Sequence, residues 1–119
     1  MIIDGAGEVG TGPVDTLLGA LGACAAIDVE LYLAKRRTPP TRLVVSVHAQ
    51  RRAEVPRRVV RARLEFEIDG VGIEAEHAQR AVGLAIDQYC SVSASLAEDL
   101  TIERSVIVNG AKVVGGTGA

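Results

Sequence analysis

The order of apolar and polar positions predicts a first long helix followed by a hairpin. Residues 14–36 place apolar side chains around more than one face, which is typical of a helix at the centre of an assembly. Pro13 suits the first helical turn, and Pro39-Pro40 prevents continuation. Residues 43–50 and 60–68 alternate apolar with polar side chains, so we expect an antiparallel hairpin with one solvent-facing side.

The remaining periodicity predicts a second helix and a further strand. Residues 74–89 carry apolar side chains at helical spacing, namely Ala78, Ala81, Val82, Ala85, Ile86 and Tyr89. A short helix is expected at 91–96 and a strand at 100–108. Residues 1–12 are expected to form a short strand over the apolar run 1–3, followed by a glycine-rich loop, and residues 109–119 a flexible tail. This mixture of helices and strands predicts one α/β domain over residues 1–119.

Composition and charge narrow the function classes. The 119 residues are 48% hydrophobic but only 3% aromatic, so the core must be built from aliphatic and small side chains. The net charge of −2 gives no general electrostatic case for binding nucleic acid or a membrane surface. Eight of the thirteen basic residues nevertheless lie between Lys35 and Arg58. We expect these to be a solvated, locally positive edge.

The predicted location of the protein is the cytoplasm. We expect no membrane helix, which requires roughly 20 apolar residues in succession, and residues 1–10 lack the pattern of a signal peptide. In that compartment, two cysteines far apart in sequence are expected to be reduced thiols or a redox pair.

The two cysteines are the candidate chemical groups. Cys24 lies in the middle of the apolar helix, where a cysteine is either a small core side chain or a nucleophile. Asp28, one turn later, disfavours its thiolate. Cys90 lies between two predicted helices, where its thiol faces either a negative C-terminus or a positive N-terminus, and the sequence leaves both open.

Other chemistry has weaker support in the sequence. His48 and His77 have no suitably spaced Cys or carboxylate partners, so we expect no metal. The glycines of residues 5–10 superficially match a nucleotide-binding loop, but they lack the preceding βαβ context, and we expect no cofactor.

Two segments resemble the OsmC/Ohr family. They are residues 12–29, GPVDTLLGALGACAAIDV, and residues 89–96, YCSVSASL. The resemblance implies an α+β fold in which two central helices pack with an antiparallel sheet in an intertwined homodimer, with active sites at the subunit interface. It also implies a thiol peroxidase that reduces organic hydroperoxides. Cys24 would attack the peroxide, Cys90 would resolve the product into a disulfide, and a small dithiol such as a lipoyl group would be the reductant.

The chain departs from the family pattern at two positions, which leaves other functions open. Family peroxidases hold the thiolate with an N-terminal Arg, but no Arg precedes Arg36 here. The family's Glu on the first helical turn aligns with the shorter Asp15, which is therefore the third candidate site residue. Arg36, Arg51 or Arg52, from either subunit, are candidate substitutes for the Arg.

Two alternatives to the peroxidase follow from these departures. One is an OsmC-like dimer that binds a small apolar ligand at its interface while its thiols remain idle. The other is a shortened interaction protein that pairs a sheet edge with another subunit.

Overall fold

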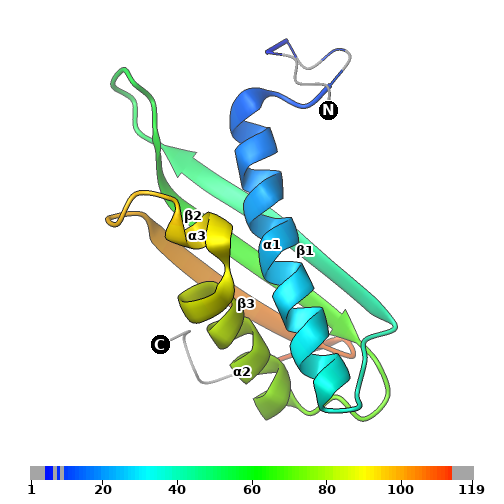
Figure 1. Cartoon of the computed structure of the whole chain (residues 1–119). Helices are drawn as coiled ribbons and strands as arrows, with labels where there is room; N and C mark the ends of the chain where they lie inside the picture. The colour runs from blue at the N-terminus through cyan, green and yellow to red at the C-terminus, as the bar shows by residue number, and fades with distance from the viewer. Residues whose placement is uncertain (1–4, 7, 9, 114–119) are drawn as a thin grey trace.

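The computed structural model describes residues 5, 6, 8 and 10–113, in which helices cover one face of a four-stranded sheet (Figure 1). Helix α1 (Pro13–Lys35) begins at the proline whose missing N–H costs nothing there. Strand β1 (Arg42–Arg51) follows the Pro39-Pro40 pair. The predicted α+β fold, the first helix and the hairpin are confirmed, whereas the strand predicted at residues 1–3 lies outside the described residues.

The sheet has the order β1-β2-β3-β4. Strand β2 (Val59–Asp69) pairs antiparallel with β1 and parallel with β3 (Thr101–Val108). The sheet is therefore mixed, whereas the family resemblance implied an antiparallel sheet. Strand β4 (Ala111–Lys112) then closes a short antiparallel hairpin on β3. Since β2 and β3 are parallel, the chain between them must cross over the sheet, and helices supply that crossover.

The core lies between the sheet and α1, and the alternation along β2 defines it. The inward side chains of β2 are fully buried, whereas the residues between them face away from the helices. The buried residues of α1 recur every three or four positions and pack on this face. The fully buried apolar side chains include Leu21, Val29 and Leu33 of α1, Leu64, Phe66 and Ile68 of β2, and Val82.

A glycine allows α1 to lie close to the sheet. A Cβ atom on Gly22 would lie 2.8 Å from Val47 Cγ2 and 3.6 Å from Val45 Cγ1. The first distance is shorter than real Cβ contacts, so a side chain at position 22 would displace the helix or the valine. The small residues of α1 therefore set the spacing between helix and sheet.

The crossover from β2 to β3 consists of three consecutive helical segments. They are α2 (Ala75–Leu84), the π-helix η1 (Ala85–Tyr89) and the single-turn α3 (Ser91–Ala94). The sequence predicted one regular helix through Tyr89 on the apolar face, but Tyr89 is 62% exposed. That prediction was wrong because the wider π turn rotates the last residues away from the face that Ala78 and Val82 share.

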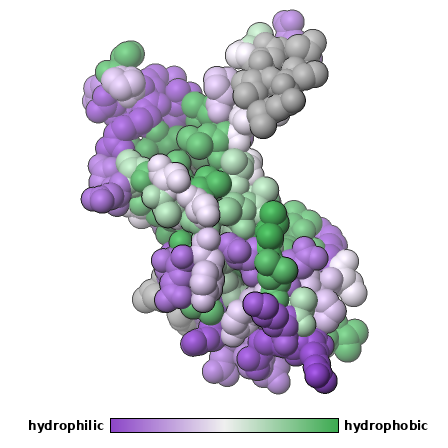
Figure 2. Space-filling view, viewed as in Figure 1, coloured by the Kyte–Doolittle hydropathy of each residue, from purple (hydrophilic) through white to green (hydrophobic). Residues whose placement is uncertain are grey.

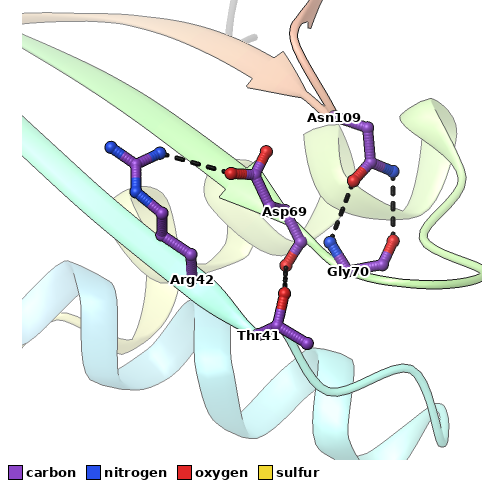
Figure 3. A network of polar contacts seen from close by, with 5 residues as sticks. All are labelled: Thr41, Arg42, Asp69, Gly70 and Asn109. Atoms are coloured by element: carbon purple, nitrogen blue, oxygen red, sulfur yellow. Dashed lines mark hydrogen bonds and ion pairs between the residues drawn. The ribbon is translucent and has the colours of Figure 1, made fainter.

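A polar network fixes the chain where β2 ends, and it includes a residue assigned to the flexible tail (Figure 3). The Asn109 side chain accepts a hydrogen bond from Gly70 N–H at 2.9 Å and donates one to Gly70 C=O at 3.0 Å. Beside it, Arg42 and Thr41 both bond Asp69. The prediction of a tail from residue 109 onwards is therefore wrong for residues 109–113, which form this turn and β4; residues 114–119 lie outside the described residues.

Helix α1 also corrects the expectation about membrane helices. It has 23 residues, and by length and apolar composition alone it is able to cross a membrane. A core helix passes the same test, and one face of α1 is packed on the sheet.

Candidate functional site

The structure brings the two cysteines together although 66 positions separate them in sequence. Cys24 lies on the middle of α1 and Cys90 follows η1; Cys90 is part of the buried core and Cys24 packs against that core, close enough to influence the Cys90 thiol. They lie close together because α3 packs against α1 directly after Cys90. Two thiols that neighbour each other in the fold meet the first requirement for disulfide formation.

Cys90 is held by the backbone on both sides. Its N–H donates to Ala85 C=O at 2.8 Å, the last bond of the π-helix, and its Sγ accepts a hydrogen bond from Ser93 N–H at 3.3 Å. Cys90 is therefore both the end of η1 and the N-cap of α3, which resolves the two environments that the sequence left open.

The two thiols differ in burial and in protonation. Burial raises the pKa of the Cys90 thiol above its usual value of 9.0; the Ser93 N–H lowers it, and the contact with Cys24 raises it further. Cys90 is only 3% exposed, whereas Cys24 is half-buried. At neutral pH Cys90 is thus a protonated thiol, and Cys24 is the cysteine that solvent reaches.

Asp15, the third candidate residue, lies apart from the two cysteines within one chain. It is exposed on the first turn of α1, nine residues before Cys24, which corresponds to roughly 13 Å along a helix. It lines an open cavity of about 600 Å³ together with His48 and Arg51. One chain therefore brings a carboxylate and a guanidinium to one cavity, but not to the thiols.

The three arginines considered as substitutes for the family's Arg make contacts elsewhere. Arg36 caps α1, and its guanidinium lies 2.7 Å from His77 Nε2. Arg51 Nε donates to Arg57 C=O, and Arg52 Nε donates to Pro56 C=O, both within the β1–β2 turn. In the described part of one chain, these hydrogen bonds direct all three guanidinium groups to partners other than Cys24.

An apolar groove lies along the N-terminal half of α1. Its volume is about 240 Å³, and α1, β2 and residues 96–100 form its walls. Figure 2 shows this hydrophobic surface between α1, α3 and the hydrophilic tip of the β1–β2 hairpin. The lining residues are Val14, Leu17, Leu18, Leu21, Arg57, Arg58, Val59, Ala62, Leu96, Ala97 and Leu100.

Comparison with known proteins identifies the family of this chain. The model of the OsmC-like protein family matches residues 5–105. This chain belongs to the OsmC-like family. Protein YhfA of Escherichia coli K12 is 33% identical over 106 residues, which are 88% of this chain and 79% of YhfA.

Two solved structures illustrate that the fold is shared with other proteins. A hypothetical protein from Aquifex aeolicus superposes with a TM-score of 0.80 at 26% identity, over 86% of this chain and 76% of that one. The organic hydroperoxide resistance protein OhrB of Bacillus subtilis superposes with a TM-score of 0.56 at 16% identity, over 87% and 74% respectively. At that identity, the OhrB match shows the fold alone.

Some features of this OsmC-like protein were not predicted from its sequence. The groove residues Leu96 and Leu100 were assigned to a helix end and a strand start, and nothing in their periodicity indicated that they face Leu17. The Ser93 N–H that bonds Cys90 had one signal, the run of small hydroxyl residues after Cys90, which is typical of a helix start.

Proposed function

We propose that this OsmC-like protein is a thiol peroxidase that reduces organic hydroperoxides. The Cys24 thiolate attacks the terminal peroxide oxygen, the O–O bond breaks, and the alkoxide leaves as an alcohol after taking a proton. Cys24 is then a sulfenic acid. The Cys90 sulfur attacks Cys24 Sγ, the S–S bond forms, and the sulfenic oxygen leaves as water. A small dithiol returns the two electrons and two protons by thiol–disulfide exchange.

The proximity of Cys24 and Cys90, which two helical segments bring together in one part of the core, is the observation that carries this proposal. A core cysteine needs no second thiol beside it, whereas a resolving cysteine must reach the sulfenic sulfur. The half-buried Cys24 is accessible to a peroxide, and the buried, protonated Cys90 stays unreactive until Cys24 is oxidised. The name of the OhrB protein is consistent with this chemistry.

The proposal includes a homodimer built around α1. Leu17, Ile27 and Leu31 are exposed large apolar residues of this helix, and Tyr89 lies exposed on η1. Figure 2 shows hydrophobic surface continuing along α1. A stable monomer rarely leaves such a surface uncovered. Light scattering at micromolar concentration should give twice the mass of 12.4 kDa, and a clean monomer would contradict this part of the proposal.

A second copy also offers a role for Asp15. Within one chain Asp15 and Arg51 share a cavity away from the thiols, so they reach Cys24 only if they come from the other subunit. A carboxylate-held guanidinium beside Cys24 would favour its thiolate and orient the peroxide. We assign the reaction to the cytoplasm, where a thiol reductant is present.

Mass spectrometry after stoichiometric cumene hydroperoxide tests the reaction directly. The wild type should form a Cys24–Cys90 disulfide. Cys90→Ser should accumulate a Cys24 sulfenic acid that dimedone labels, because no resolving thiol remains. Cys24→Ser should show neither labelling nor turnover. A wild type without the disulfide, together with an unlabelled Cys90→Ser variant, would exclude the peroxidase.

The apolar groove supports a second candidate function. Its nearly all-aliphatic walls and its volume of about 240 Å³ suit a short acyl chain or one aromatic ring. If the thiols fail the peroxide test, Leu18→Trp, which fills the groove, should abolish binding of an apolar fluorescent probe. Unchanged probe binding would reject the groove as the ligand site.

A further inference from the structure

One charged side chain occupies the core face of β3. Ile102, Val106 and Val108 share that face by alternation, and Arg104 stands between them. In the parallel register Arg104 lies beside Leu64, which is fully buried, and its own side chain is only 10% exposed. A guanidinium in such a place is costly unless its charge is paired, and an aliphatic residue would satisfy the strand pattern.

The partner of Arg104 is in the π-helix that leads to Cys90. Arg104 Nη1 donates to Asp87 Oδ2 at 3.1 Å, and Nη2 donates to Asp87 Oδ1 at 3.0 Å. Two parallel hydrogen bonds fix orientation as well as distance. Asp87 lies in the middle of η1, three residues before Cys90. The pair thus ties a strand of the sheet to the segment that presents the thiol.

The π-helix needs such a tie because its backbone favours the α form. A π turn is rare and less stable than an α turn, and it persists where surrounding contacts hold it. Here Cys90 itself makes the last hydrogen bond of the π-helix, because its N–H donates to the Ala85 carbonyl instead of the Ile86 carbonyl. Relaxation to an α turn would move that bond to Ile86 and rotate Cys90 about the helix axis.

We propose that the Arg104–Asp87 ion pair is a positioning device that holds η1 in its π form and thereby keeps the Cys90 sulfur against Cys24. This inference rests on the proposed function in one respect: Cys90 is the resolving thiol. Neither residue touches the reacting sulfur atoms. Their effect on the reaction is confined to the second step, in which Cys90 must reach the Cys24 sulfenic acid.

The first test needs no peroxide. In a Cys24→Ser background, the buried Cys90 should react slowly with iodoacetamide, and Arg104→Met should accelerate that alkylation at least fivefold. Arg61→Met is the matched control, because it removes another arginine ion pair, with Glu103 of β3, on the outer face of the sheet and away from η1. Alkylation within twofold of the parent in Arg104→Met, or equal acceleration in Arg61→Met, would overturn the proposal.

The second test separates the two steps of the reaction. In the protein with both cysteines, Arg104→Met should leave the rate of Cys24 oxidation by cumene hydroperoxide within twofold and slow disulfide closure at least fivefold. A loss of the oxidation step alone would contradict a positioning role for Cys90.

A less disruptive variant guards against loss of folding. If Arg104→Met does not fold, Asp87→Asn removes the ion pair at its 44% exposed end and should show the same alkylation effect. Failure of the peroxidase proposal appears instead as a wild type that forms no disulfide with peroxide, whatever the alkylation rates are.

Discussion

Oxidation of the cysteine pair should raise the thermal stability of the fold strongly. The bond would close a loop of about 66 residues, and the chain-entropy relation then gives about 15 cal/mol/K, or about 4 kcal/mol at 25 °C. Unfolding entropy of about 2.1 cal/mol/K per residue amounts to about 0.25 kcal/mol/K for 119 residues. The expected rise in Tm is therefore about 15 °C, and strain in the new bond would lower it.

Circular dichroism melting of reduced and diamide-oxidised protein, at one protein concentration, measures this rise. Mass spectrometry must first show that the oxidised sample holds the Cys24–Cys90 bond within one chain. The control is the Cys90→Ser variant treated with the same oxidant, whose Tm should not change. An intact bond with an unchanged or lower Tm would show that the two sulfurs reach each other only by distorting the fold, and the contact described here would be refuted.

Three further predictions follow from individual residues. Asp15→Asn should lower the free energy of unfolding, measured in urea, by about 0.3–1 kcal/mol, because a carboxylate at a helix start is attracted to the positive end of the helix dipole. If this variant leaves peroxide turnover unchanged, Asp15 acts only at the helix start. Gly22→Ala should destabilise by about 1 kcal/mol through the Val47 clash, whereas Gly83→Ala, with no atom within 4 Å, should not. The raised pKa of Cys90 means that the native state keeps its proton longer than the unfolded state. Stability should therefore fall as pH rises above 9.0, more steeply than in Cys90→Ser.

The local elements were predictable because their signals are local. The alternation along β2 assigned the inward side chains correctly, since a strand with one buried face has a period of two. The bounds of α1 followed from Pro13 at one end and Pro39-Pro40 at the other. The family motifs around Cys24 and Cys90 indicated the fold in which these elements assemble.

The missed features depend on contacts between distant parts of the chain. The periodicity of residues 74–89 predicted one regular helix, because nothing in that segment indicates a π turn at 85–89 or the contact of its Asp87 with Arg104 of another element. Asn109 was placed in a flexible tail, because its hydrogen bonds reach Gly70 across the sheet. Nor does the strand pattern at 101–108 say that β3 lies parallel to β2.

The division of labour between the two thiols follows from their positions. A resolving cysteine that ionised easily would itself be oxidised by peroxide, and the pair would lose its order of reaction. Burial at the junction of η1 and α3 raises the pKa of Cys90 and shields it from solvent. The same junction places the Cys90 side chain in the part of the core against which Cys24 packs. If the proposed function holds, the element that makes Cys90 unreactive toward peroxide also makes it ready for the sulfenic acid. A variant that loosens η1 should then both expose Cys90 to direct oxidation by peroxide and slow its attack on the Cys24 sulfenic acid.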